Sequence, residues 1–543
     1  MIRRLLLLAA GSVVAAFVYP IFASAPNLDR AAVALALAGS AAGAAVATAA
    51  GRPPLVAAAL AGVGAYVSGL LALHGFPVPV SVVIGAGAGA VAGALVALLC
   101  ARLDGASFLV ATLLLAIAGG AAVQALPAIT GAQSGLGPIP PLSLPLGATK
   151  SAVLTPLGDF HALLAAATLS AALAALMLWR GFGPGWRAVG SDRARAAASG
   201  LRPLVSDATA LALAGLLAAL SGALAAHVTR LASPDSFAPD VAALPLLAAL
   251  AAGRDPIGAA AVAVGTGLVG VVILPAAGWQ GPPDAMSLAI GTLAIAALFT
   301  LLPGGARQRD APATSIDATS PWPLDGLGLR GAHLVVPSIQ VHAANGGLLV
   351  DSPGFSVEPG AFQAVVGPNG AGKTTLLTAI LARAGPSGDV IATAGEARGR
   401  VVLLPQEGGG FAACSVRETL LLGARPGRSA AGARALAEAW LHRLGLEASA
   451  DTLCVELSGG QRRLVDLARV LLSAPNVLLC DEPLAGLDDG SRAAASACLR
   501  AAAQAGLTII VAEHDRDAVA ALATGVIALE RADTAPRPAT ASL

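Results

Sequence analysis

Residues 367–374 carry the residue types that bind a polyphosphate. They read Gly-Pro-Asn-Gly-Ala-Gly-Lys-Thr and fit the pattern G-x-x-x-x-G-K-[ST]. In such a loop the glycines let backbone N–H groups converge on phosphates, the lysine reaches the terminal phosphates, and the threonine hydroxyl can ligate Mg²⁺. Residues 364–366 predict a buried strand before the loop, and residues 375–382 predict a helix after it. The positive end of that helix adds to the phosphate site.

Five further motifs follow this loop along the chain. A strand ends at Gln406, a helix opens after Ser458, a buried strand ends in Asp481 and Glu482, Asp488 follows at once, and a last strand runs into His514. Each motif alone is weak, but a chance match of all five in this order is very improbable. Over about residues 335–530 the set resembles the ATP-binding cassette family.

The residue types suggest what each position does. Glu482 can polarise the attacking water as a general base, Gln406 can contact the metal or the water, and His514 can touch the γ-phosphate. The predicted catalytic residues are Glu482, His514 and Gln406. The predicted ligands of Mg²⁺ are Thr374, Gln406 and Asp481. The predicted ATP-binding residues are Gly367, Pro368, Asn369, Gly370, Ala371, Gly372, Lys373, Thr374, Thr375, Ser458, Gly459, Gly460, Gln461 and Asp488.

The cassette resemblance also implies a partner. In that family the stretch beginning at Ser458 completes the site of a second cassette, so that two cassettes enclose two ATP molecules. The sequence departs from the family where an aromatic ring usually stacks on adenine. That position lies near Ala344, and the nearest ring belongs to His342. A lost stacking contact of about 1 kcal/mol predicts modest ATP affinity.

The composition excludes a protein that is soluble throughout. Of 543 residues, 56% are hydrophobic and only 12% are charged, against about 25% charged in soluble domains. Residues 1–305 are nearly free of charge, and the net charge of +1 gives no reason to expect nucleic acid as a partner. Five cysteines show no metal-binding spacing and are predicted to be reduced packing residues: Cys100, Cys414, Cys454, Cys480 and Cys498.

Ten apolar segments of the first 305 residues are candidates to cross a membrane, which takes about 20 residues. They lie near 5–23, 31–50, 54–74, 78–100, 106–126, 161–179, 207–229, 239–253, 256–276 and 284–302, and the eighth is short. Many are rich in glycine and alanine, which let membrane helices approach closely. We therefore expect an all-α polytopic domain of about ten helices, surrounded by membrane lipid.

Basic residues between these segments indicate the orientation. With a cytoplasmic N-terminus and ten crossings, twelve arginines face the cytoplasm and three basic residues face outward. The cytoplasmic set is Arg3, Arg4, Arg52, Arg102, Arg180, Arg187, Arg193, Arg195, Arg202, Arg254, Arg307 and Arg309, against Arg30, Lys150 and Arg230. This bias follows the positive-inside rule. An even number of crossings also returns the chain to the cytoplasm, where an ATP site must be.

Three parts of the membrane half leave alternatives open. Residues 3–25 are typical both of a cleavable signal peptide and of an uncleaved first helix. The outer loop 127–160 is interpreted as a lid, as a docking surface for a partner or as a simple connector. The basic loop 180–206, with a short helix predicted over 192–199, either transmits motion or only anchors the chain by its charge.

Three stretches resemble the permeases of branched-chain amino acid importers of the ABC type. They are residues 102–113 with 130–140, residues 186–201, and residues 233–237 with 253–265. The second resembles the cytoplasmic coupling segment of that family. The sequence departs from the family at Ala132, at Gly190 and Ser191, and over 251–254. The resemblance implies a second permease and a second cassette, or a second copy of this chain, and an external solute-binding protein.

The chain is therefore predicted to have four parts. Residues 1–303 form the permease, and the Pro-, Gly- and Ser/Thr-rich residues 304–332 form a flexible linker. Residues 333–530 form an α/β P-loop ATPase domain whose first strands cover 334–341 and 348–350. Residues 531–543 form a disordered tail.

Together these features predict ATP-driven import of branched-chain or related amino acids across a bacterial inner membrane, with the ATPase domain in the cytoplasm. One alternative is an importer of urea or small organic acids. A second is an exporter-type half-transporter, which usually has six spans and long charged helices. A third is an ATPase that powers or regulates something other than solute passage.

Overall fold

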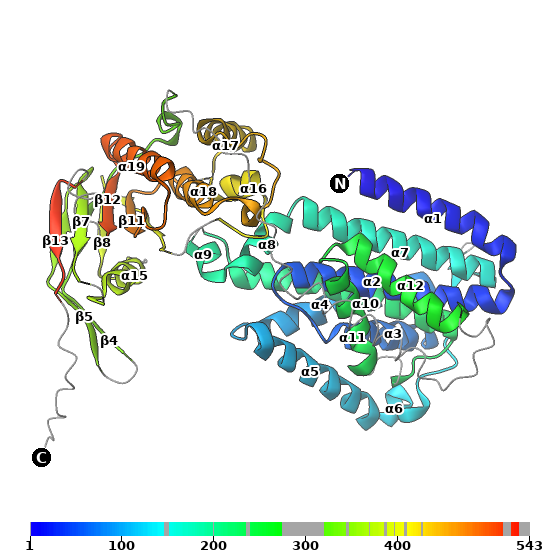
Figure 1. Ribbon diagram of the computed structural model, residues 1–543. Coiled ribbons are helices and arrows are strands. Elements are labelled where there is room, and N and C mark those ends of the chain that lie inside the picture. Colours follow the sequence, from blue (N-terminus) through cyan, green and yellow to red (C-terminus); the bar gives the residue numbers. More distant parts are fainter. Residues whose placement is uncertain are drawn as a thin grey trace, which may run out of the picture. The chain divides into compact units, whose positions relative to one another are not determined.

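The chain forms two compact units. The computed structural model describes residues 2–145, 151–198, 200–234, 239–273, 320–343, 347–368, 370–384, 388–395, 397–406, 410–424, 427–513 and 523–530. One unit comprises residues 1–196 and 201–305, and the other comprises residues 197–200 and 306–543. The first is mainly helical, with one short pair of strands, and the second contains the larger sheets (Figure 1).

The first unit is a bundle of long apolar helices. Its main helices are α1 (Ile2–Phe22), α2 (Ala25–Ala49), α3 (Ala57–Leu73), α4 (Val78–Leu99), α5 (Gly105–Ala125), α7 (Pro156–Trp179), α10 (Pro203–Thr229), α11 (Pro239–Ala251) and α12 (Pro256–Leu268), which continues as the π-helical turn η3 (Val269–Ile273). Within the described residues, seven helices are long and apolar enough to cross a membrane. Nine of the ten predicted segments fall on helices, and the tenth, 284–302, lies outside the described residues.

Two of the predicted spans are shorter than expected. Helix α3 has 17 residues and α11 has 13. A 13-residue helix is about 20 Å long, less than the roughly 30 Å of a hydrocarbon core. Helix α11 contains Pro245 and is followed by Gly253, whose φ is +62°. By its length, α11 does not cross a bilayer unaided.

Helix α10 packs against α2, α3 and α4 through small residues. A Cβ on Gly89 of α4 would lie 2.1 Å from the Cβ of Ala219 and 2.5 Å from the carbonyl oxygen of Gly215. A Cβ on Gly64 of α3 would lie 2.0 Å from the carbonyl oxygen of Ala219. At these positions the helix backbones touch, and only glycine permits that distance. This is the close approach that the glycine- and alanine-rich segments predicted.

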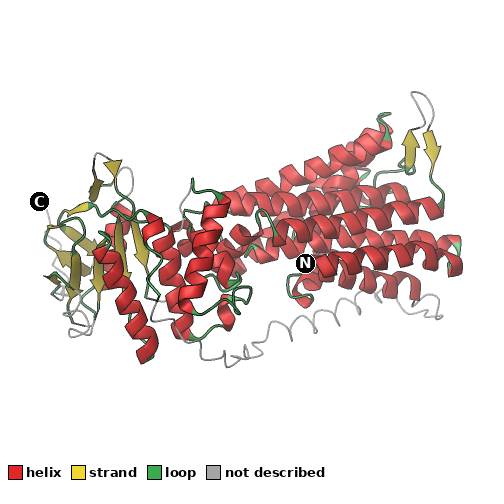
Figure 2. Ribbon diagram, turned by 90° about the horizontal axis from the view of Figure 1, so that it is seen from above, coloured by secondary structure: helices red, strands yellow, loops and turns green. Residues whose placement is uncertain are grey.

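Shorter elements occupy the loops of this unit. The outer loop contains α6 (Pro127–Thr130), the 3₁₀ turn η1 (Ala132–Ser134) and an antiparallel pair of strands, β1 (Ser143–Pro145) and β2 (Ser151–Val153). Figure 2 shows this pair of strands beside the ends of the helices. The basic loop contains α8 (Gly183–Ser191) and α9 (Arg193–Ala198). Helix α9 matches the helix predicted over 192–199. Helix α8 was not predicted, because the glycines at 181, 183 and 185 disfavour a helix.

The second unit is built on a parallel sheet in the order β10-β11-β12-β7-β13. Its strands are β7 (Phe362–Val366), β10 (Val401–Leu404), β11 (Val477–Asp481), β12 (Thr508–Ala512) and β13 (Gly525–Ala528). The helices are α15 (Lys373–Arg383), α16 (Val416–Gly423), α17 (Ala430–Leu444), α18 (Gly459–Leu472) and α19 (Asp489–Gln504). The parallel strands are nearly all apolar, as expected of strands buried on both faces.

A second sheet and a hairpin accompany the parallel sheet. The antiparallel order is β6-β3-β8-β9, from β6 (Phe355–Val357), β3 (His333–Val336), β8 (Ile391–Ala394) and β9 (Ala397–Arg398). Strands β4 (Ile339–His342) and β5 (Leu348–Ser352) form the hairpin. The prediction of one strand over 334–341 is wrong at Pro337, which has no N–H to donate. The chain leaves one sheet there and enters another.

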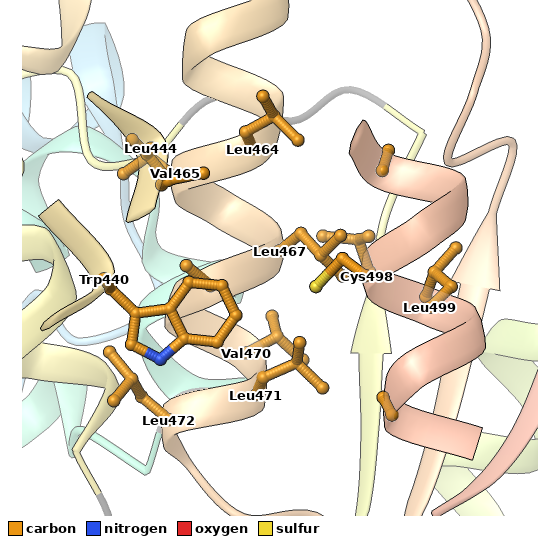
Figure 3. Close-up of a cluster of buried hydrophobic side chains, with 14 of the residues drawn as sticks. Trp440, Leu444, Leu464, Val465, Leu467, Val470, Leu471, Leu472, Cys498 and Leu499 are labelled. Atoms are coloured by element: carbon orange, nitrogen blue, oxygen red, sulfur yellow. The ribbon is translucent and has the colours of Figure 1, made fainter. Parts of the chain in front are cut away.

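Among the described residues of this unit, buried side chains form two cores. One surrounds α18 and joins it to α17, α19 and the parallel sheet, and Figure 3 shows Leu467 of α18 beside Cys498 of α19 in this core. The other lies between α15 and the strands around it. All five cysteines of the chain are buried and free, and burial raises the pKa of Cys454 to about 11. They therefore serve as packing residues, as predicted.

Residues 320–332 pack onto the second unit. Leu324 and Leu327 are 5% and 2% exposed and belong to the core around α18. The guanidinium carbon of Arg443 lies 3.7 Å from the ring centroid of Trp322. The Asn476 side-chain amide donates to the Arg330 carbonyl over 2.7 Å. This part of the predicted linker therefore packs against the rest of the second unit. The domain boundaries themselves stay a prediction.

Candidate active site

The predicted phosphate loop joins the end of β7 to the start of α15. Gly370 and Gly372 have φ values of +78° and +86°, in the left-handed region that glycine adopts without penalty. A Cβ on Gly372 would also lie 2.4 Å from Cγ2 of Val350 and 2.8 Å from the carbonyl oxygen of Leu349. The Ala371 N–H donates to the Pro368 carbonyl over 3.1 Å. The glycine spacing is therefore required by the backbone path.

Lys373 folds back over the loop that precedes it. It is 6% exposed, and its Nζ donates to the carbonyl oxygens of Gly367 (2.9 Å) and Pro368 (3.2 Å). Gly372 is the N-cap of α15, where no side chain caps the helix. The first-turn N–H groups, including that of Thr375, can therefore face an anion, which the helix dipole favours.

Asp481 ends β11 beside this loop. Its side chain is 2% exposed and accepts a hydrogen bond from the Thr374 hydroxyl. Burial raises the pKa of Asp481 above the usual value, and the bond from Thr374 opposes that rise. Among the described residues, no group hydrogen-bonds to Oδ1 of Asp481. A buried carboxylate oxygen next to a hydroxyl fits Mg²⁺, which takes oxygen ligands.

Glu482 follows Asp481 in an unusual backbone conformation. Its φ is +44°, which is uncommon for a residue with a side chain and often marks a functional position. Its N–H donates to the Ala512 carbonyl of β12 over 2.8 Å. Gln406 Nε2 donates to Glu482 Oε2 over 2.7 Å. Two residues predicted to be catalytic thus lie in contact, although 76 positions separate them in sequence.

Arg463 of α18 is a site residue that sequence reasoning missed. Its side chain is buried, and Nη2 donates to the carbonyl oxygens of Asp481 (2.9 Å) and Glu482 (3.1 Å). Nη1 donates to the carbonyl of Pro405, the residue before Gln406. The guanidinium therefore ties together the strand ends that carry both acids and the glutamine. The sequence shows two adjacent arginines here, and only the fold distinguishes the buried one.

The remaining predicted ATP-binding residues, Ser458 to Gln461 and Asp488, lie at the starts of α18 and α19. Ser458 and Gln461 form a capping box, in which the Gln461 N–H donates to Ser458 Oγ over 3.2 Å. Gly459 opens the helix. A Cβ on Gly460 would lie 2.8 Å from Oδ2 of Asp488, so the two loops touch. Among the described residues, no hydrogen bond joins either loop to the phosphate loop.

Asp488 caps α19 with both carboxylate oxygens. Oδ1 accepts from the Ser491 N–H over 2.9 Å and Oδ2 from the Ser491 hydroxyl over 2.8 Å. These hydrogen bonds, the backbone one first, hold the pKa of Asp488 below its usual value. Asp488 therefore carries a negative charge at the surface beside Gly460.

Three of the positions named from the sequence for the ATP site lie outside the described residues. They are Asn369, His514 and Ala344, and their parts in the site stay predictions. His342, the ring nearest the predicted adenine position, is exposed at the end of β4, where the register with β5 shifts.

The first unit, called the membrane unit below, contains a cavity of about 740 Å³ along α3, α4 and α5. Its lining is mostly apolar, and Tyr66, Gln124 and Thr130 add polar groups. No segment pattern predicted it, because alanine, glycine, valine and leucine recur throughout this half of the chain.

Two family models match the chain. The model described as "Branched-chain amino acid transport system / permease component" matches residues 28–298. The model described as "ABC transporter" matches residues 350–485. The two matches cover separate parts of one polypeptide, in the order that the sequence predicts.

Curated proteins are similar to the second part. Nod factor export ATP-binding protein I of Paraburkholderia xenovorans is 41% identical over 175 residues, which are 31% of this chain and 58% of that protein. Molybdenum import ATP-binding protein ModC of Mycobacterium tuberculosis is 38% identical over 195 residues, which are 32% of this chain and 53% of that protein. This chain spans a little over half the length of these relatives. One is named for export and the other for import.

A solved structure is also similar to this part of the chain. It is a nucleotide-free ATP-binding cassette from an ABC transporter, 23% identical, with a TM-score of 0.31, and the match covers 37% of this chain and 88% of that one.

Proposed function

Because the chain belongs to the ABC transporters, as a permease of the branched-chain amino acid type fused to an ATP-hydrolysing domain in one multi-pass membrane protein, we propose that it imports branched-chain or related amino acids. The observation that carries this proposal is the permease match over residues 28–298. That match names a substrate class, whereas the cassette relatives include both an exporter and an importer.

The proposed hydrolytic site follows from the positions of the side chains. Lys373 and the loop amides hold the β- and γ-phosphates of ATP, and Thr374 and Asp481 hold Mg²⁺. Glu482 takes a proton from the attacking water, and Gln406, hydrogen-bonded to it at 2.7 Å, orients that carboxylate. Arg463 fixes the strand ends on which these groups sit. His514 is proposed to contact the γ-phosphate.

When bound, Mg²⁺ neutralises charge on the transferred phosphoryl group. The fit rests on the buried Oδ1 of Asp481, which has no hydrogen-bond partner among the described residues. It also rests on the Thr374 hydroxyl that contacts the same carboxylate.

The residues at the start of α18 are proposed to serve a second cassette. Ser458, Gly459, Gly460 and Gln461 present a hydroxyl, amides and a helix N-terminus, which favours a phosphate. Within the described residues, Ser458, Gly459 and Gly460 are not hydrogen-bonded to this chain's own phosphate loop. A second cassette, from another subunit or a second copy of this chain, would place its ATP against them, and Asp488 would order that interface.

The proposed setting is a bacterial inner membrane with the ATPase domain in the cytoplasm. The proposed partners are a second permease and an external solute-binding protein. Closure of two cassettes would move the segment around α8 and α9 and switch the permease between outward- and inward-facing states. Urea or small organic acids are the alternative cargo, and export is the alternative direction.

The direction can be tested in inside-out membrane vesicles from cells that express the chain with its neighbouring transporter genes. The vesicle lumen, which corresponds to the cell exterior, is loaded with labelled leucine before ATP is added. Import predicts ATP-dependent release of leucine into the medium. ATP-dependent accumulation in the lumen would instead establish export. If labelled urea or an organic acid is released while leucine is retained, that compound and not leucine is the substrate.

A further inference from the structure

Asp207 is the centre of a cluster of four charged side chains that come from separate loops and helices of the membrane unit. Arg52, in the loop between α2 and α3, donates through Nε to Asp207 Oδ2 over 2.9 Å, and its Nη2 lies 2.8 Å from the same oxygen. Arg193 of α9 donates to that oxygen over 2.8 Å. Asp104, just before α5, lies 3.2 Å from Arg52 and 3.5 Å from Arg193. We call these four residues the Asp207 cluster.

The members of the cluster differ in burial. The side chains of Arg52 and Asp207 are 1% and 0% exposed, whereas those of Arg193 and Asp104 are 29% and 66% exposed. Arg52 also donates to the Leu103 carbonyl and lies 4.9 Å from the ring centroid of Phe108. The buried charge of Asp207 is therefore already matched by a buried, well-held arginine. Neutralising Asp207 does not require Arg193, so the bond from α9 is an addition to a completed pair.

Asp207 has room for a second arrangement. Both arginines reach Oδ2, while Oδ1 is buried and has no hydrogen-bond partner among the described residues. One of the two guanidinium groups can therefore move its hydrogen bond from Oδ2 to Oδ1 while the ion pair with Asp207 is kept. Two discrete hydrogen-bonded states of this kind are what a conformational switch requires.

The helix that carries Asp207 is suited to pass on a displacement. Asp207 lies in the first turns of α10, which contacts α2, α3 and α4 with backbone-to-backbone approaches at Gly64, Gly89 and Gly93. Close-packed contacts of this kind do not deform continuously. A pull on Asp207 would therefore move α10 together with its neighbours rather than bend its end.

We propose that Arg193 is a positioning residue that ties α9 to α10 through Asp207 and transmits the movement driven by ATP to the spanning helices. This inference rests on the proposed function, because it assumes that ATP changes the state of the permease. Arg193 is an ionic link between the segment that resembles a coupling segment and the core of the bundle. The Arg52–Asp207 pair keeps that core folded.

The test measures ATP hydrolysis and permease state in the same full-length protein. A cysteine is introduced as Gln124→Cys, at an exposed residue that lines the cavity along α5. In proteoliposomes, the rate of its labelling by a maleimide is measured with and without ATP. In the parent, ATP should change that rate by about 5- to 150-fold, the range typical of coupled sites. Arg193→Gln should abolish this response and change ATP hydrolysis by less than about twofold.

Two variants separate transmission from a structural role. Arg193→Lys keeps a cation beside Asp207 and should restore much of the response. Arg202→Gln removes the same charge from the exposed N-cap of α10 and should leave the response unchanged. A normal response in Arg193→Gln would overturn the inference. So would a lost response that goes with a lower unfolding temperature and that Arg193→Lys does not repair.

The parent protein separates this inference from the proposed function. If ATP leaves Gln124→Cys labelling unchanged in the parent although hydrolysis proceeds, the proposed transport cycle fails, and this inference fails with it. If the parent responds and Arg193→Gln responds equally, only the inference fails.

Discussion

The two units of this chain carry their function in different ways. In the cassette, a few polar side chains at strand ends and helix starts have fixed places, as with Glu482 and Gln406 at 2.7 Å. In the membrane unit, α10 touches its neighbours through the backbone at Gly64 and Gly89. One unit depends on which groups are present at a site, and the other on which side-chain atoms are absent from a helix interface.

The comparison predicts that each unit tolerates different substitutions. A change that preserves shape but removes chemistry should be severe in the cassette. A change that adds a few carbon atoms at a buried helix contact should be severe in the bundle. The following predictions are ordered by the size of the expected effect.

The largest effect should come from Glu482→Gln. The substitution keeps the size of the side chain and its place beside Gln406 but removes the base, so ATP binding should persist. Hydrolysis should fall by about 10²- to 10⁴-fold, the usual contribution of a general base. Asp489→Asn, which removes a carboxylate charge at an exposed position farther along the chain, is the matched control. Unchanged turnover of purified Glu482→Gln protein would remove Glu482 from the proposed role.

In the bundle, Gly89→Val should destabilise the protein where Gly87→Val does not. Both lie in α4, so both substitutions change the intrinsic helix preference alike. A Cβ at 89 would lie 2.1 Å from Ala219 Cβ, whereas at 87 no atom lies within 4 Å. Overpacking of this kind costs about 1–3 kcal/mol. The unfolding temperature in detergent distinguishes the two, and equal stability of the pair would contradict the packing argument.

The smallest effect should come from Asp488→Ala, because this exposed residue caps α19. Loss of such a cap costs about 1 kcal/mol. The pKa of Asp488 is lowered in the folded protein. Its contribution is therefore complete above about pH 3.9, the usual aspartate value, and is lost as the pH falls through the lower folded pKa. The stability advantage of the parent cassette over the variant, measured by thermal unfolding, should shrink on acidification. A constant advantage would contradict this account of the cap.

The cassette could be predicted from the sequence because its functional residues lie in short, contiguous motifs. The strand before Gly367, the helix after it and the acid-ended strand β11 all lie where they were predicted. Arg463 was missed, because burial beneath the ends of β10 and β11 depends on tertiary packing and not on a local pattern. The break at Pro337 was also missed, since the apolar residues on both sides continue through it.

The membrane unit was predictable only as a set of apolar segments. Composition located nine described helices, but the shortness of α11 depends on where its ends are fixed by neighbours. The Asp207 cluster could not be predicted from the sequence, because Arg52 and Asp207 are 155 positions apart. Positive-inside counting assigned Arg52 and Arg193 to the cytoplasmic side but could not show that they share one carboxylate. Long-range ionic contacts have no spacing rule.

The most direct test of the central claim is uptake of labelled leucine by intact cells that express this chain with its neighbouring transporter genes. Cells carrying Glu482→Gln at the same expression level are the control. The account predicts leucine uptake in the parent and its loss in the variant, which would establish direction, energy source and substrate class together. Equal leucine uptake in both, or none in the parent while its ATP hydrolysis is intact, would contradict ATP-driven leucine import.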